Sequence, residues 1–499
     1  MVENNLFTDN RIGMFLENAT NAVFGGLGKA EGNTIVGNSD ALSGVYSEGI
    51  LARGVCTGSS IVGTDITGTS TGVWLQSVTG LGVSNSTITD SEFYGLTASG
   101  TLTGSSFNDN SIMGSLAVPG PGHAMNLVDA QGLSVLDNMA ESNAGSGLYV
   151  TGTTTGTKVQ GNLFTDNRIG IQVLNATDAV IGGLGEDEGN TIVGQADALN
   201  GVFREGVLVQ GTQSGTSITG TSITDTSTGV WILAPSVTMT GTKVADSEFY
   251  GVYASGNLTG SSFVDGEISG SLATPGPGNG INLVGAQNLR IENNDIAGNQ
   301  GAGLSVTGAT SGTLVYDNDF TDNRVAILLS DATDAVIGGT ETGEDNRIVG
   351  GGDPNTGDFR DGVVALGVVT GSTVQNLSIT DTVTGILLQA AQQLTLTDIT
   401  MTKVQWYGVN ASGNLTGTTF TNSSISETGL GPVGFGVVLS GVQNFVFEKN
   451  SISDSAGVGM LALGDCTGTR VIDTTWSSNP INLIDNSGGT LTINPLPPA

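Results

Sequence analysis

The sequence has few charged, aromatic and basic residues and no long apolar run. Charged residues make up 12% and aromatic residues 5% of the 499 residues. No run of about 18 apolar residues occurs, so the sequence predicts no transmembrane helix. Only 14 basic residues oppose 46 acidic residues, and the formal charge of −32 repels phosphate backbones and anionic lipid headgroups. We therefore expect neither nucleic-acid binding nor membrane insertion.

Cysteine and histidine are also scarce. Cys56 and Cys466 lie so far apart in the chain that we expect two buried, free thiols rather than a disulfide. The single histidine, His123, aligns with Asn279 and Phe435 in the other repeats, so a site used by every repeat cannot depend on it. We expect His123 to be a solvated loop residue.

Glycine and apolar residues are plentiful. The chain holds 79 glycines and 37% hydrophobic residues. Gly and β-branched residues weaken helices, so this composition favours many short strands joined by tight turns. The apolar share is large enough to fill a long, thin core.

A long internal repeat organises the chain. Residues 5–13 recur almost without gaps at 162–170 and 318–326. The repeat predicts one continuous solenoid over residues 1–499 rather than several globular domains. Its modules span approximately 5–161, 162–317 and 318–473, followed by a final coil with a Pro-rich end at 474–499.

A shorter period divides each module. In the second copy, Gly followed by alternating apolar residues occurs at Gly170-Ile171, Gly206-Val207, Gly229-Val230, Gly251-Val252, Gly280-Ile281 and Gly303-Leu304. Six such marks give coils of roughly 26 residues, and about nineteen coils in all, each with three short strands. The predicted fold is an all-β, right-handed parallel β-helix. We expect Asn190, Asn294 and Asn318 to adopt left-handed corner turns and to stack in hydrogen-bonded ladders.

One motif resembles a known family. Residues 179–183, Ala-Val-Ile-Gly-Gly, are followed by Gly-Asn-Thr-Ile-Val-Gly at 189–194, and the pair recurs in the other modules. It resembles the repeat signature of bacterial or archaeal surface proteins with the right-handed parallel β-helix of the pectate-lyase-like fold. The resemblance implies the fold, but that fold carries lyases, epimerases, hydrolases, adhesins and structural rods, so it implies no single activity.

The candidate ligand-binding residues end the longest loop of each module. Glu48, Glu205 and Asp361 stand directly before a strand glycine, and long loops on rigid scaffolds commonly bind ligands. The arginines expected beside them are Arg11, Arg168, Arg324, Arg204 and Arg360. A salt bridge from loop to coil is the favoured interpretation, and a carbohydrate or cation contact is the alternative.

Two further sets of residues have alternative interpretations. Glu186, Asp187 and Glu188 could bind Ca²⁺, but a solvated acidic turn is favoured because Lys29-Ala30-Glu31 and Thr342-Gly343-Glu344-Asp345 do not keep the charge. No other cofactor is expected. Aromatic residues recur at two positions, and core packing is favoured over sugar stacking for them. These are Trp74 and Trp231, with Leu387 in the third copy, and Tyr94, Tyr250 and Tyr407.

The favoured function is a non-catalytic extracellular or cell-surface rod, structural or adhesive, that presents repeated loops to carbohydrate or another surface polymer. Near-identical modules favour multivalent contact over one catalytic cleft. The alternative is a polysaccharide lyase, epimerase or glycoside hydrolase that groups Glu205, Arg204 and Arg168 with Asp166. The Asp-Pro-His motif of mannuronan epimerases is absent, as are the Gly-His-Gly and Arg-x-Lys elements of polygalacturonases.

The two ends suggest different roles. Pro495, Pro497 and Pro498 should stop strand pairing. Residues 1–5 resemble the middle of a module and show no signal-peptide pattern; if the protein is exported, we expect that its signal was removed or lies on a longer parent. We expect either excision from a longer repeat protein or end-to-end self-association of the open first coil.

Overall fold

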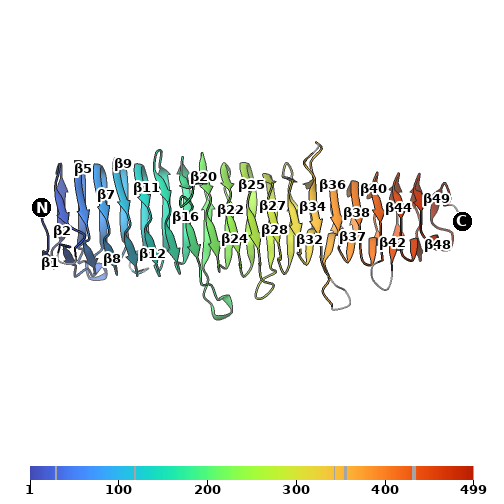
Figure 1. Ribbon diagram of the computed structural model, residues 1–499, viewed down its shortest axis with the longest axis horizontal. Coiled ribbons are helices and arrows are strands. Elements are labelled where there is room, and N and C mark those ends of the chain that lie inside the picture. The colour runs from blue at the N-terminus through green and yellow to red at the C-terminus, as the bar shows by residue number, and fades with distance from the viewer. Residues whose placement is uncertain are drawn as a thin grey trace. The chain divides into compact units, whose positions relative to one another are not determined.

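The computed structural model describes residues 1–28, 31–116, 118, 120–341, 343–352, 357–429 and 434–497. It divides into two compact units, unit 1 at Met1–Glu248 and unit 2 at Phe249–Ala499. Both are all-parallel β-solenoids. Together they contain about 20 turns, with 61% of the residues in strands and 1% in helices. Figure 1 shows the strands of each unit stacked side by side. The predicted parallel β-helix is confirmed.

The strands of unit 1 form three parallel faces, and four long strands continue around a corner from the second face to the third. The first face consists of β1 (Leu6–Thr8), β4 (Thr34–Val36), β6 (Asp65–Thr67), β8 (Thr87–Thr89), β10 (Ser111–Met113), β12 (Met139–Glu141), β15 (Leu163–Thr165), β18 (Thr191–Val193), β21 (Ser222–Thr224) and β24 (Lys243–Ala245). The second consists of β2 (Ile12–Glu17), β5 (Glu48–Val62), β7 (Thr71–Ser84), β9 (Tyr94–Asn108), β11 (His123–Leu136), β13 (Ser146–Thr153), β16 (Ile169–Thr177), β19 (Glu205–Gln210) and β22 (Thr228–Leu233). The third adds β3 (Val23–Gly25), β14 (Lys158–Gln160), β17 (Val180–Gly182), β20 (Thr216–Thr219) and β23 (Val237–Thr240).

Unit 2 repeats this arrangement. Its first face contains β26 (Glu267–Ser269), β28 (Asp295–Ala297), β31 (Asp319–Thr321), β34 (Asn346–Val349), β41 (Ser424–Ser426), β44 (Ser451–Ser453), β47 (Thr475–Ser477) and parts of β36 (Thr373–Thr380) and β38 (Thr395–Thr402). Its second contains β25 (Tyr250–Val264), β27 (Asn279–Glu292), β29 (Ala302–Ala309), β32 (Val325–Thr333), β35 (Asp361–Val368), β37 (Thr384–Gln392), β39 (Tyr407–Asn414), β42 (Phe435–Gln443), β45 (Val458–Leu463) and β48 (Ile481–Asn486). Its third includes β30 (Leu314–Tyr316), β33 (Val336–Ile337), β40 (Thr419–Thr421), β43 (Val446–Glu448), β46 (Arg470–Ile472) and β49 (Thr492–Asn494). The last strand, β49, ends directly before Pro495, and Pro498 lies outside the described residues.

The core follows from strand alternation. In β19, Val207 and Val209 are fully buried, whereas Leu208 between them faces outward and is half-buried. Successive side chains of a strand point to opposite faces, so inward residues stack coil upon coil. The predicted inward residue Ile223 has no exposed surface, and both cysteines are free and fully buried, as expected.

Asparagine ladders occupy the corner between the third and first faces. The amide nitrogen of Asn138 donates to Oδ1 of Asn162 at 3.0 Å, and Asn162 donates in turn to Asn190 at 3.0 Å. In unit 2, Asn294 donates to Asn318 at 2.9 Å. The predicted ladders are confirmed. The predicted left-handed backbone is wrong for Asn190, Asn294 and Asn318; before Asn294 and Asn318 it belongs to the preceding residues, Asn293 and Asp317.

Candidate functional site

Strand pairing places each candidate carboxylate beside an arginine. In unit 1, the backbone N–H of Glu205 donates to the carbonyl oxygen of Arg168 at 3.0 Å. Arg168 directly precedes β16, the strand paired with β19, so the fold joins these two residues across one coil. The same bond joins Glu48 to Arg11 at 2.8 Å and Asp361 to Arg324 at 3.0 Å.

The carboxylates are half-buried, and each is paired in register with a threonine of the next strand. Burial raises the pKa of Glu48, Glu205 and Asp361, because a charged carboxylate loses hydration there. Hydrogen bonds from the threonines and the nearby arginine charges lower the pKa in part. At Glu205, the indole Nε1–H of Trp231 also donates to Oε2 at 3.0 Å.

The arginines do not form the salt bridges expected with these carboxylates. Within the described residues, no ion pair of 4.0 Å or less joins Arg168 to Glu205. Arg204 instead pairs with Asp166, with 2.7 Å between Nε and Oδ1. In unit 2, Arg360 pairs with Asp358 at 2.9 Å, and its guanidinium donates to the carbonyl oxygen of Asp322.

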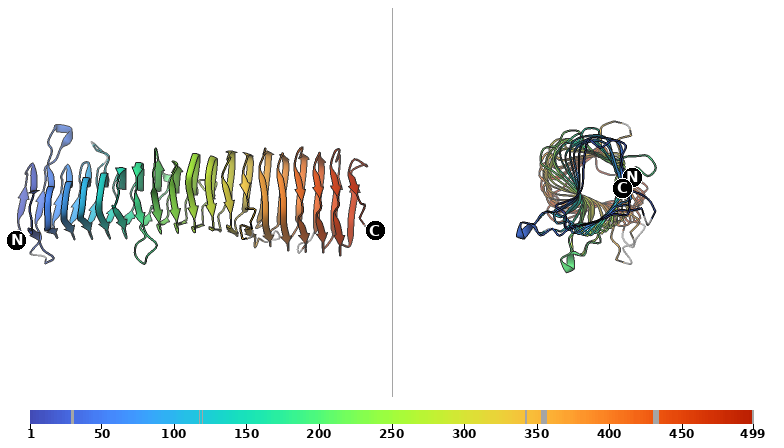
Figure 2. Two further views of the ribbon diagram at one scale, coloured as in Figure 1. Left: turned by 90° about the horizontal axis from the view of Figure 1, so that it is seen from above. Right: turned by 90° about the vertical axis from the view of Figure 1, so that its left-hand side faces the viewer.

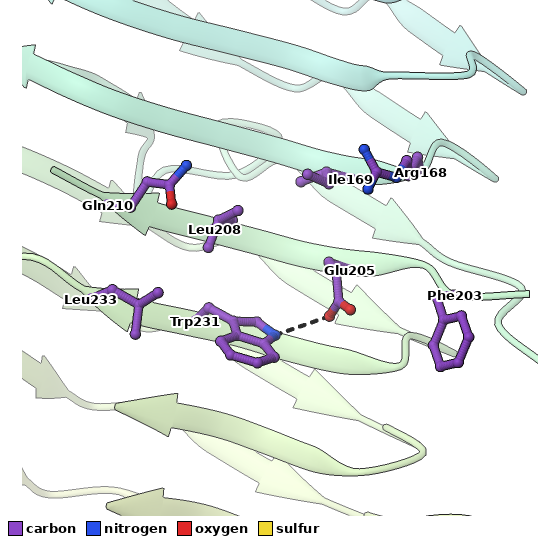
Figure 3. A pocket seen from close by; sticks show the side chains of 8 residues that line it. All are labelled: Arg168, Ile169, Phe203, Glu205, Leu208, Gln210, Trp231 and Leu233. Atoms are coloured by element: carbon purple, nitrogen blue, oxygen red, sulfur yellow. Dashed lines mark hydrogen bonds between the residues drawn. The ribbon is translucent and has the colours of Figure 1, made fainter. Parts of the chain in front are cut away.

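A pocket of about 320 Å³ opens on the second face of unit 1 (Figure 3). Its walls are Arg168, Ile169, Phe203, Glu205, Leu208, Gln210, Trp231 and Leu233. Glu205 and Trp231 lie on neighbouring strands and point toward each other, as Figure 3 shows. A more polar hollow of about 640 Å³ shares Arg168 and Phe203 with this pocket and includes Asp166 and Arg204. Both hollows therefore border Arg168 and Phe203.

Core packing was the wrong expectation for the recurrent aromatic residues. Trp74 and Trp231 are half-buried on the outer side of the second face, while their strand neighbours point inward. Tyr94, Tyr250 and Tyr407 are also half-buried. The alternation in β22 could have revealed this, because Val230 and Ile232 are inward and the residue between them must face outward.

The loop before β19 is held by Glu248, a residue that the sequence analysis did not single out. A short 3₁₀ helix, η2 (Ala198–Asn200), starts after Asp197, whose side chain accepts from the Asn200 N–H. The Ala198 N–H donates to the Glu248 carboxylate at 3.0 Å. In the first module, η1 (Ala41–Ser43) is held in the same way, with the Ala41 N–H donating to Glu92 at 3.1 Å. The bond to Glu248 anchors the loop that carries Phe203 to the pocket.

His123 is not the solvated loop residue that was expected. It begins β11, its Nδ1 accepts a hydrogen bond from the Ser146 N–H at 2.9 Å, and its ring stacks on Tyr149 with 4.8 Å between centroids. Burial lowers the pKa of His123 to about 4. In unit 2, Oδ1 of Asn279 makes the equivalent bond, accepting from the Ala302 N–H at 2.9 Å.

We expect His123→Asn to remove a pH dependence of stability without removing the hydrogen bond. The unfolded histidine titrates near 6.5 and the folded one near 4, so the unfolded state binds more protons in this window. Wild-type stability should therefore fall by up to about 3 kcal/mol as pH drops from 6.5 toward 4. Denaturant melts at several pH values in this range should show that the free energy of unfolding depends less on pH in His123→Asn than in the wild type. His123→Ala, which leaves the Ser146 N–H unpaired, should be less stable at every pH; equal slopes for wild type and His123→Asn would refute the assignment.

The described residues offer no metal site. No group of three or more His, Cys, Asp or Glu side chains there is arranged to hold an ion. Of the Ca²⁺ candidates, Glu188 accepts from the N–H of Gly185 at 3.1 Å, and Asp187 takes a left-handed backbone. Lys29, Ala30 and Thr342, with which these residues were compared, lie outside the described residues. Nor does any helix in the described part of the chain have the length and apolar character to cross a membrane.

Several solved structures are similar in strand arrangement. The A-module of mannuronan C-5 epimerase AlgE4 from Azotobacter vinelandii is 15% identical, with 79% of this chain and 91% of that chain covered and a TM-score of 0.33. The periplasmic alginate epimerase AlgG is 11% identical, with 90% and 77% covered and a TM-score of 0.27. The Agl-KA catalytic domain is 12% identical, with 83% and 62% covered and a TM-score of 0.33. Similarity at this level supports no statement about the activity or ligand of this chain.

The sequence also matches two family models, while no curated protein matches it. Residues 51–181 match the periplasmic copper-binding protein (NosD) family. The described residues of that range do not fit a copper centre, because no group of three or more His, Cys, Asp or Glu side chains there is arranged to hold an ion. Residues 205–359 and 361–494, more than half of the chain, match the right handed beta helix region model. The chain therefore belongs to the right-handed β-helix family.

Proposed function

We propose that this protein is a non-catalytic extracellular, periplasmic or cell-surface protein that binds polysaccharide through its repeated loop sites. The observation that carries the proposal is the pocket on β19 and β22, where the Trp231 indole forms one wall and Glu205 fixes its orientation at 3.0 Å. Half-buried indole rings offer a flat apolar surface to the faces of sugar rings. Gln210 and Glu205 add hydrogen-bonding groups for hydroxyls beside it.

Repetition of the site supports binding rather than catalysis. The first module repeats the residue types of this site, with Glu48 beside Arg11 and an outward Trp74, although Glu48 bonds to Thr71 and not to the tryptophan. Similar weak sites on the same unit raise avidity for a polymer without a tight single site. In the third module, Leu387 replaces the tryptophan, which predicts a weaker contact there.

We expect Trp231→Leu to weaken binding at the second-module pocket by about fivefold, because stacking contributes roughly 1 kcal/mol and Leu cannot replace it. A glycan array with the full chain would first select the polysaccharide, and calorimetry with a short oligomer would then compare the variants. Leu387→Ala, at the equivalent position of unit 2, is the matched control and should change affinity little. Absence of binding to every polysaccharide tested would overturn the proposed function.

One observation favours the alternative of a polysaccharide lyase, epimerase or hydrolase. Burial raises the pKa of Glu205, which lies next to Arg168, and a carboxyl group with a raised pKa can serve acid–base chemistry on a sugar. Asp166, however, is held by Arg204. Incubation with uronate and neutral polysaccharides, followed by detection of unsaturated products or reducing ends, separates the two functions. Turnover that Glu205→Gln abolishes would replace binding by catalysis as the function.

A further inference from the structure

One outward row on the second face of unit 1 brings together aromatic residues that are distant in sequence. The strand register aligns Trp74, Thr97, Asn126, Tyr149, Gln172, Leu208 and Trp231, here called the aromatic row. Tyr149 lies three strands from each tryptophan. At ~4.8 Å between strands, an aromatic side chain recurs about every 14 Å.

The side chains between the aromatic residues are held in place by bonds from coil to coil. The amide nitrogen of Asn126 donates to Oγ1 of Thr97 at 3.0 Å. Ser146 Oγ donates to Oε1 of Gln172 at 3.0 Å. The Tyr149 ring is stacked on His123 with an interplanar angle of 7°. A ligand would therefore meet a surface that loses little conformational entropy on binding.

This surface is nearly free of charge, although the chain carries a formal charge of −32. The aromatic row contains no Asp, Glu, Lys, Arg or His. The adjacent row toward the strand ends is also uncharged and consists of Gln76, Ser99, Val128, Thr151, Leu174, Gln210 and Leu233. The first residues of the same strands contain one charged group, Glu205, among Thr71, Tyr94, His123, Ser146, Ile169, Glu205 and Thr228. Burial keeps His123 neutral, since its pKa is lowered to about 4.

We infer that one extended, uncharged polysaccharide chain lies along the second face of unit 1 and stacks on Trp74, Tyr149 and Trp231. The inference rests on the proposed function and specifies its ligand. A ring of an extended glycan is about as long as the ~4.8 Å strand spacing, so about seven rings span the six strand steps between the tryptophans. The half-buried side chains of Thr97 and Gln172 in this row meet the hydroxyls of the intervening rings. A polyanion would find no row of cations along this path.

Graded oligosaccharides test both the length and the charge of the ligand. The probes are cello-, xylo- and manno-oligosaccharides of about three to about ten rings, with oligogalacturonates of equal length as the charged comparison, titrated into the full chain. We expect weak binding of short neutral oligomers and an increase in affinity of about 100-fold or more once the length reaches about seven rings, because the second and third contacts become intramolecular. Oligogalacturonates should bind more weakly at every length.

Variants separate the inference from the proposed function. Tyr149→Thr introduces the residue type that Thr97 supplies in the same row, and it should reduce the increase with length more than it reduces the affinity for short oligomers, which can still stack on either tryptophan. Leu387→Ala in unit 2 is the control, and melting curves verify that each variant is folded. Short-oligomer binding without any increase at about seven rings would overturn the extended path but keep the proposed function. Tighter binding of oligogalacturonates would overturn the uncharged ligand, and no binding by any probe would remove both.

Discussion

Ile223→Asp is expected to lower the free energy of unfolding by several kcal/mol, roughly 4 kcal/mol or more, because it buries an unpaired carboxylate. Ile223 has no exposed surface and is paired in register with Ile192 on one side and Val244 on the other. No cation lies among these partners to offset the charge. Neighbouring coils share the same core, so the loss should spread along it. Thermal and denaturant melts followed by circular dichroism measure the effect.

The control for this substitution is Thr224→Asp, one residue along the same strand. Its side chain faces outward, so the carboxylate stays hydrated and the melt should shift little. Comparable losses for the two variants would show that the effect is a property of the strand and not of its inward face. An unchanged melt for Ile223→Asp would mean that the strand register is incorrect.

Asn162→Ala should also be strongly destabilising, by roughly 3–5 kcal/mol, because it leaves several buried polar groups without partners. Oδ1 of Asn162 accepts from both the backbone N–H and the amide of Asn138, each at 3.0 Å. Its amide donates to the carbonyl oxygens of Val135 at 3.1 Å and Gln160 at 2.9 Å, and to the Asn190 side chain. Alanine provides neither an acceptor nor a donor for these groups.

Two comparisons make this prediction specific to the ladder. Asn162→Asp keeps the acceptor but removes the donor and adds a buried charge, so it should be at least as damaging as alanine. Thr165→Ala, in the next strand of the same coil and facing outward, should have little effect. Equal stability of Asn162→Ala and wild type in denaturant melts would show that the asparagine bonds contribute nothing net to folding.

The inward residues could be predicted from sequence because each strand buries every second side chain. Val207 and Val230 follow the strand glycines that mark successive coils, and both are fully buried. The ladder asparagines were likewise predictable from their recurrence at coil corners. The left-handed turn was assigned to the wrong residue. Two polar residues are adjacent at a corner such as Asn293-Asn294, and the sequence does not tell which one adopts the left-handed backbone and which one bonds to the next coil.

The candidate site was only partly predictable. Glu48, Glu205 and Asp361 recur together with an arginine in the preceding coil. This recurrence indicated the correct pairs of coils, because a backbone hydrogen bond joins each carboxylate residue to its arginine. The partners of the side chains depend on distances of a few ångströms, which the repeat does not encode. Arg204 therefore binds Asp166 rather than Glu205, and Trp231 supplies the bond to Glu205.

The sequence by itself determined the parallel β-helix, the module length and the inward-facing residues, because these depend on local periodicity. Only the tertiary structure decided which residues share a row on the outer surface. Coil length varies with the loops, so that Ile12 pairs with Glu48 across a long loop, while Glu48 pairs with Thr71 across a short one. Sequence separation therefore does not give position along the solenoid. The alignment of Trp74, Tyr149 and Trp231 follows from hydrogen-bonded register summed over every coil between them.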